Sequence, residues 1–268
     1  SNWYPAISLS WNKNKWSATL ACTNKTKRPN YSSLRNEVQY SNRYLYEGGN
    51  PYLRPCVISN IDLNVVYKWL SLNAGYNYVD KPIIWTSTLY HGKDIIFQRS
   101  LNFSKDQDLY ASLVAEPRFG WYNPMFEIDY SQTFLSTAGF DIEGIASKPS
   151  FRLRCNNRFD ISKTIKAYLN MKYRTSVHDG LQYTKPYSQM DIRLSKTFCK
   201  EAWQISLFAN DLFRQSKERW TTYGSRTSIT KNCYEYYRCV GLVVRYRFNT
   251  ANSKYKGIGA GNAEKNRL

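Results

Sequence analysis

The chain has 268 residues, carries a net charge of +18 and is rich in Tyr (23) and Trp (8). No segment approaches the ~18 consecutive apolar residues of a transmembrane helix, so a helical membrane protein is excluded and a soluble protein or a β-barrel remains. Abundant Tyr and Trp suit a surface that is apolar on one side and wet on the other. The charge is compatible with a basic solvated surface, or with an anionic partner such as nucleic acid, lipopolysaccharide or an anionic solute.

Alternation of apolar and polar residues, which is typical of strands, begins at once. Ile7–Trp11 and Trp16–Cys22 alternate on either side of a polar turn, and Ile61–Trp69 runs almost directly into Leu70–Tyr78. Helical periodicity is nearly absent. Further strands are predicted near Leu109–Ala115, Phe126–Tyr130, Phe151–Phe159, Ile165–Tyr173, Tyr187–Phe198, Trp203–Phe213 and Tyr234–Phe248.

The connections between these strands alternate short and long. Short connections lie at Asn12–Lys15, Lys68–Trp69, Arg118–Asn123, Ser162–Thr164 and Cys199–Ala202. Long ones lie at Lys25–Cys56, Asp80–Asp108, Ser136–Lys148, Ser176–Pro186 and Arg214–Asn232, and the second of them has room for strands of its own. Outer-membrane barrels have short periplasmic turns and longer extracellular loops, and this pattern is typical of them.

Tryptophan gathers at the end of the predicted sheet that carries the short turns. Five of the eight lie beside such turns, which favours an interfacial aromatic girdle over scattered caps of a sandwich core. They are Trp11, Trp16, Trp69, Trp121 and Trp203.

Sorting each strand by parity separates two chemically different faces. The apolar face is almost free of charge, and its main exception, Lys196, lies near a short turn from which it can reach the interface. Its members on the last strands include Ile165, Ala167, Leu169, Met171, Tyr173, Met190, Ile192, Leu194, Trp203, Ile205, Leu207, Ala209, Val240, Leu242 and Val244. The polar face is basic, and its candidates for the lining of a lumen are Arg152, Arg154, Arg158, Lys172, Arg174 and Arg193.

About eleven strands, many near the ~9–11 residues that cross a bilayer, make an odd number, whereas complete bacterial barrels have an even number. The first residues lack the features of a signal peptide, and Trp3–Trp11 already has the pattern of a strand. We therefore expect an all-β fold, an antiparallel transmembrane β-barrel in which these strands form the C-terminal half of a barrel of about 22 strands. Residues 1–248 would form the barrel portion, and 249–268 a basic flexible tail.

Sequence motifs of catalysis or metal binding are missing, so we expect neither an enzyme nor a cofactor. The only histidines are His91 and His178, both in predicted loops, and the six cysteines lack metal-type spacing. A local disulfide between Cys233 and Cys239 stays open as a possibility. The acidic pair Glu127 and Asp129 fits a polar lumen lining better than acid–base catalysis.

Four segments resemble those of a known family. The stretch from Lys27 to Leu34, which includes Arg28 and Pro29, and the later GGNPYLRP, which contains Gly49, Asn50, Pro51 and Pro55, resemble the "RP…LNP … GNPxLxPE" segment of TonB-dependent receptor barrels of the Bacteroidota type. Asn210 and Asp211 open a run that is similar to the family's "NDIF", and Tyr246–Phe248 is similar to its YRF strand. The chain departs from the pattern at Cys56, where the family often has Glu, and at Arg35–Asn36, where it has Asn-Pro.

This resemblance implies an outer-membrane transporter or receptor that takes up a bulky solute, with a plug domain and the TonB system as partners beside the membrane lipid. The motif residues are expected to be structural, since Gly and Pro fix the backbone where a loop returns to the barrel wall. Two alternatives stay open. One is a soluble, basic all-β module that binds nucleic acid or glycan, although we expect no nucleic-acid partner, and the other is a passive, porin-like or structural barrel.

Overall fold

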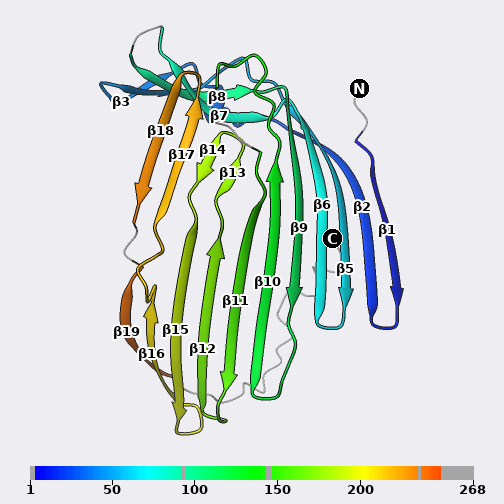
Figure 1. Cartoon of the computed structure of the whole chain (residues 1–268), viewed down its shortest axis with the longest axis vertical. Helices are drawn as coiled ribbons and strands as arrows, with labels where there is room; N and C mark the ends of the chain where they lie inside the picture. The colour runs from blue at the N-terminus through cyan, green and yellow to red at the C-terminus, as the bar shows by residue number, and fades with distance from the viewer. Residues whose placement is uncertain (1–3, 92–93, 143–146, 235–236, 249–268) are drawn as a thin grey trace, which may run out of the picture.

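A computed structural model describes residues 4–91, 94–142, 147–234 and 237–248. Its centre is one antiparallel sheet of 11 strands, in which each strand pairs with its neighbours along the wall in the order β1-β2-β5-β6-β9-β10-β11-β12-β15-β16-β19 (Figure 1). In the described part of the chain, no helix is long and apolar enough to cross a membrane. The strands of this sheet are β1 (Ala6–Lys13), β2 (Trp16–Lys27), β5 (Cys56–Tyr67), β6 (Leu70–Asp80), β9 (Lys105–Ala115), β10 (Tyr122–Thr133), β11 (Ser150–Asp160), β12 (Ile165–Arg174), β15 (Tyr187–Phe198), β16 (Trp203–Asn210) and β19 (Cys239–Tyr246).

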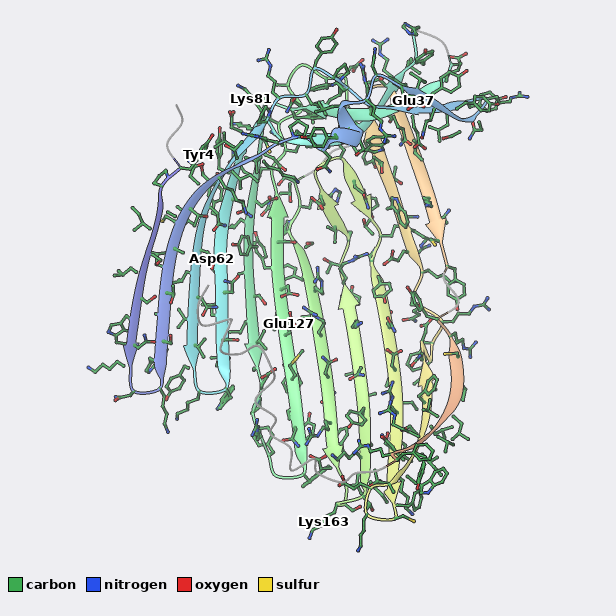
Figure 2. All side chains as sticks on the ribbon, turned by 180° about the vertical axis from the view of Figure 1, so that it is seen from behind. Tyr4, Glu37, Asp62, Lys81, Glu127 and Lys163 are labelled. Atoms are coloured by element: carbon green, nitrogen blue, oxygen red, sulfur yellow. The ribbon has the colours of Figure 1, made fainter. Side chains whose placement is uncertain are left out.

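All the predicted short connections lie at one end of this sheet, the lower end in Figure 1. Asn14 and Lys68 have φ values of 54° and 53° in the turns that join β1 to β2 and β5 to β6. Positive φ of this kind gives tight hairpin turns whose twist matches that of the strands. Lys163, in another of these turns, marks the same end in Figure 2, whereas Glu37 and Lys81 mark the opposite end.

At the opposite end the long connections form two further sheets of four strands each. One continues the wall above β12, β15, β16 and β19, and it consists of β13 (Val177–Asp179), β14 (Gln182–Thr184), β17 (Glu218–Gly224) and β18 (Thr227–Cys233). The other lies across the top of the wall in Figure 1, and it consists of β3 (Val38–Asn42), β4 (Leu45–Gly48), β7 (Ile83–Leu89) and β8 (Ile96–Asn102). The two sheets touch where Ser87 Oγ and Thr227 Oγ1 share a hydrogen bond of 2.6 Å. The predicted strand content of the Asp80–Asp108 connection is confirmed, and three other long connections hold strands that the sequence did not predict.

Two predicted strands have wrong bounds. The strand predicted over Trp203–Phe213 ends at Asn210, because Asp211 takes a φ of 46° and its side chain binds the backbone of a following turn. The strand predicted over Tyr234–Phe248 is shorter in the structure, where β19 begins at Cys239 and ends at Tyr246. Trp3 and the predicted tail, 249–268, lie outside the described residues.

The register of the main sheet confirms the division into two faces, because residues directly opposite one another in an antiparallel pair share a face. Across β10, β11, β12 and β15, one row runs Ile128, Leu153, Tyr173 and Ser188, and the next row on the same face runs Phe126, Cys155, Met171 and Met190. This apolar face lies open: Val240 is 78% exposed and Leu9 71%. An apolar surface of this extent needs an apolar environment to cover it.

The five tryptophans predicted to form a girdle are all exposed near the short-turn end. Trp16 stacks on Tyr67 with ring centroids 4.2 Å apart, and Trp203 packs on Tyr246 at 4.5 Å. Both pairs join neighbouring strands on the apolar face, so aromatic rings flank the apolar band at one level.

Candidate functional site

The polar face brings the six predicted lumen cations together on neighbouring strands. Arg152 lies directly opposite Arg174, and Arg154 directly opposite Lys172. Arg158 and Arg193 both pair with Tyr168, one from each side. Since opposite residues share a face, all six side chains belong to one surface that extends from β11 across β12 to β15.

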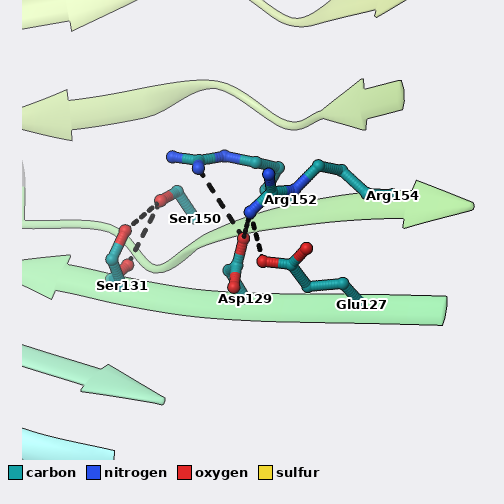
Figure 3. A network of polar contacts seen from close by, with 6 residues as sticks. All are labelled: Glu127, Asp129, Ser131, Ser150, Arg152 and Arg154. Carbon is teal, nitrogen blue, oxygen red and sulfur yellow. Dashed lines mark hydrogen bonds and ion pairs between the residues drawn. The ribbon is translucent and has the colours of Figure 1, made fainter. Parts of the chain in front are cut away.

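The acidic residues of β10 neutralise part of this surface (Figure 3). Arg154 forms an ion pair with Glu127 and lies 3.6 Å from Asp129, and Arg152 reaches the same Asp129 carboxylate at 3.7 Å. To their left in the figure, Ser131 and Ser150 share a hydrogen bond of 2.7 Å that joins the same two strands. Glu127 thus accepts a charge-assisted hydrogen bond from Arg154, whereas Asp129 lies only within ion-pair distance of Arg152 and Arg154, and both carboxylates fit a polar lining.

The positive charges of the other cations in this cluster are less neutralised by nearby carboxylates. Arg158 pairs with Asp160 on its own strand at 2.7 Å. Arg174 lies over the Tyr187 ring, 5.7 Å from its centroid, and Arg193 lies 6.0 Å from that of Phe208. Among the residues that the structure describes, neither of these arginines nor Lys172 forms an ion pair. The surface therefore keeps an excess of positive charge that can attract anions.

A second polar cluster on the same face was missed in the sequence. On β5, β6 and β9, the Tyr110 hydroxyl donates to Asp62 at 2.6 Å, Asn73 donates to Asp62 at 2.9 Å, and Asn60 donates to Asn77 at 2.6 Å. Gly75 lies beneath the Tyr110 ring. A glycine inside a strand often marks a close approach of this kind, and that is the signal that could have identified the cluster.

The GGNPYLRP signature organises the loops above the sheet. Asn50 is buried, donates to the carbonyl of Ser100 at 3.1 Å, and accepts from the amide of Tyr52. Gly49 passes so close to Arg35 that a β-carbon there would overlap its backbone carbonyl. Leu53 is buried after the turn that follows Pro51. Gly49 and Asn50 thus connect this loop to the Arg35 backbone and to β8.

The residues that flank the signature lie at the ends of two paired strands. Arg28 and Pro29 follow β2, and Pro55 precedes β5, where Cys56 pairs with Lys27. The Cys56 thiol, at this departure from the family pattern, is buried and lies 3.6 Å from the Lys27 carbonyl.

The Asn210-Asp211 motif forms a bulge in the wall. The fully buried Asp211 carboxylate accepts hydrogen bonds from the Gln215 amide at 2.9 Å and from the Ser216 hydroxyl at 2.7 Å. After the bulge the chain returns to β15, where the Leu212 amide donates to the Met190 carbonyl at 3.0 Å. The motif thus lies where β16 ends, and Asp211 anchors the turn that follows.

No group of three or more His, Cys, Asp or Glu side chains in the described ranges could hold a metal ion. All six cysteines are free thiols, so the Cys233–Cys239 disulfide that the sequence left open is not formed.

Comparison with known proteins decides the family. A model described as "Outer membrane protein beta-barrel family" matches residues 1–246. The chain belongs to this outer membrane β-barrel family. The protein is therefore located in the cell outer membrane. In barrels of this kind the apolar face lies against lipid and the polar face lines the interior, and the end with the short turns is periplasmic. The comparison with curated proteins gave no match.

Two solved structures from Pseudomonas aeruginosa have a similar fold. The siderophore receptor PirA is 14% identical with a TM-score of 0.62 over 87% of this chain. The ferric enterobactin receptor PfeA, a point mutant in complex with enterobactin, is 13% identical with a TM-score of 0.57 over 81% of this chain. The chain spans 42% of the first structure's length and 36% of the second's. The similarity confirms the predicted receptor-barrel fold.

Proposed function

We propose that this chain forms part of the barrel of a TonB-dependent-type outer-membrane transporter that takes up a bulky solute. The main observation in favour of this proposal is the 11-stranded wall, in which the edge strands β1 and β19 do not pair with each other. Open edges with unpaired backbone are unstable in a membrane. We infer that about as many further strands close the wall around a lumen wide enough for a plug domain.

The fold similarity supports this proposal. PirA and PfeA are named as receptors for a siderophore and for ferric enterobactin, and their chains are more than twice as long as the part matched here. A passive porin is the competing function, because it would share the fold but lack a plug and energy coupling. A soluble binding module no longer competes, because the family is one of the outer membrane.

The decisive experiment measures energy-coupled growth. Cells that carry the full-length gene, cells without it, and cells with the gene but without TonB are compared on a panel of ferric chelates, glycans and peptides as limiting nutrients. The proposal predicts that growth on one of these solutes requires both the gene and TonB. Solute entry that depends on the gene and continues without TonB would favour the porin instead.

We further propose that the interior near β11 and β12 selects anionic solutes. Lys172, Arg174 and Arg193 support this, since they add positive charge that the β10 carboxylates do not balance. Replacing both Arg152 and Arg154 by Glu should reduce uptake of an anionic solute about tenfold or more, because two favourable charge contacts become repulsive.

The matched control replaces Lys163 and Lys200, which lie in two short periplasmic turns, by Glu. This change alters the net charge equally but leaves the interior as it is, so uptake should stay near that of the wild type. Equal uptake by both double variants would contradict anion selection.

A further inference from the structure

The outer surface of the wall carries a groove on its apolar face. It has a volume of about 530 Å³, and its lining includes both apolar rows described above. Cys155 and Ser188 place small side chains in its floor, whereas Phe126, Met190 and Phe213 flank them. Glu127, Arg154 and Lys172, which alternate with these rows along β10, β11 and β12, also border the groove. Because the paired apolar rows share the lipid-facing side, we infer that the groove opens toward lipid.

The Asp211 bulge builds one wall of the groove. The buried Asp211 carboxylate holds the following turn, and Leu212 still pairs with β15. Phe213 therefore projects from the turn, 65% exposed, beside the apolar rows. Gln215 accepts a hydrogen bond from the Ser188 hydroxyl, which fixes the turn over the floor. If β16 continued here as a regular strand, no turn would project from the sheet to form this side of the groove.

The groove lies in the outer-leaflet half of the wall. Met171 and Tyr173 are close to the end of β12, at Arg174, that is remote from the periplasmic turns. Ser188 and Met190 lie near the matching end of β15. The apolar floor is therefore at the depth of lipid acyl chains, and the turn at 211–217 is near the headgroups.

Two cations stand at the headgroup side. Arg214 and Lys217 flank Gln215, both are exposed, and both lie over the Tyr234 ring, at 5.4 and 6.0 Å from its centroid. In the described ranges neither forms an ion pair with a carboxylate. Neither cation lines the groove itself, but Arg214 is the chain neighbour of Phe213 and Gln215, which do. An apolar groove with cations beside it is complementary to a molecule with an apolar chain and an anionic head.

We propose that this groove binds one lipid of the outer leaflet with a net negative headgroup, with an acyl chain over Cys155 and Met171 and the anionic headgroup at Arg214 and Lys217. This inference rests on the outer-membrane placement and not on the proposed transport. A bound lipid of this kind would hold the Asp211 turn against β15 and stabilise the wall where its strand order is broken.

The test uses native mass spectrometry of the full-length protein in detergent, with phosphatidylglycerol or phosphatidylcholine of identical acyl chains added. The wild type should retain one phosphatidylglycerol about tenfold more strongly than phosphatidylcholine, because two cations contribute at the headgroup. Replacing Arg214 and Lys217 together by Gln should remove that preference. Equal retention of the two lipids by the wild type would overturn the proposal.

A matched pair of substitutions tests the groove itself. Cys155→Trp fills the floor, whereas Cys22→Trp adds the same bulk at an exposed, lipid-facing cysteine on β2. The first should lose the retained lipid and the second should keep it, and retention by both would overturn the proposal. Phe213→Ala, on an exposed turn, provides a second test in case Cys155→Trp does not fold, as judged by heat-modifiability on a gel. It should weaken retention, and unchanged retention would again overturn the proposal.

Discussion

Tyr110 and Asp62 are joined by a hydrogen bond of 2.6 Å although a whole strand, β6, lies between their strands. The Tyr110 side chain crosses β6 directly over Gly75, which pairs with Asp62 on one side and with Tyr110 on the other. Gly241 and Phe208 repeat the arrangement at the other edge of the wall, where the ring again covers the glycine. Aromatic rings over glycine thus tie strands together on the inner face.

This arrangement predicts that Gly75→Ala is costly. The added methyl group would overlap the Tyr110 ring, so the ring must move and the bond to Asp62 is lost. The expected loss is about 2–4 kcal/mol in the free energy of unfolding, as overpacking and a broken hydrogen bond combine. Urea unfolding in detergent measures it. Tyr110→Phe removes the hydrogen bond alone and should cost about 1 kcal/mol, so an equal or smaller effect of Gly75→Ala would contradict this account.

The contacts of Asp211 predict a second position at which substitution lowers the stability of the protein. Asp211→Ala leaves the Gln215 and Ser216 amides without their acceptor in a buried turn, which should cost about 1–3 kcal/mol. Thermal unfolding should show a matching fall in Tm. Asp141→Ala is the control, because the Asp141 ion pair with Arg226 is exposed and should contribute under about 1 kcal/mol. Two variants of equal Tm would show that the turn does not depend on the carboxylate.

Substitutions of Gly49, in the loop signature, and of Gly120, in a short turn, should differ in their effect on stability. Gly49→Ala places a methyl group against the Arg35 backbone, which cannot rotate away, and about 2–4 kcal/mol of local destabilisation follows. Gly120 has a φ of 62° but open space around it, so Gly120→Ala should cost only about 1 kcal/mol, from backbone strain. Limited proteolysis reports the difference: the loops around Gly49 should be cut faster in Gly49→Ala alone. Unchanged cleavage would show that the Arg35 contact is not required.

His178, on β13, predicts that the stability of the sheet β13-β14-β17-β18 depends on pH. Burial, and then the nearby Lys148 ammonium, lower the pKa of His178 below its usual value. The folded state therefore binds fewer protons than the unfolded state, and stability is lost as the pH falls through the unfolded value of about 6.5. His178→Gln should show a smaller decrease in Tm from about pH 7.5 to about pH 5.5 than the wild type. A decrease of the same size in both would assign the pH dependence to other groups.

Most of the wall could be predicted from the sequence, because an antiparallel strand between lipid and water alternates with period two. Tyr187–Phe198 was predicted with the bounds that the structure has, and the register places all six predicted cations on one face. The alternation also separated short turns from long connections. The alternation shows which face a residue lies on, but it does not show which carboxylate lies beside which arginine. That depends on the register between β10 and β11.

The remaining features depend on contacts between distant segments. The pairing of β4 with β8 is parallel and joins two different long connections, so no local pattern indicates it. The end of β16 depends on Asp211, whose side chain competes with the strand for backbone amides. One side of the outer groove is formed by the turn that follows Asp211, which lies beside β15. Local alternation therefore predicts the strands, while polar side chains that bind backbone determine where the strands stop.

The most direct test of the two-faced wall is a scan of spin labels along β12, one position at a time, in the full-length protein reconstituted in lipid and without its native cysteines. Ile165, Ala167 and Leu169 should be accessible to oxygen dissolved in the bilayer, whereas Lys166, Tyr168 and Asn170 should be accessible to a water-soluble nickel complex. A clear alternation of this phase would confirm that the apolar face meets lipid and the basic face lines the interior. Uniform accessibility along β12, or alternation of the opposite phase, would contradict it.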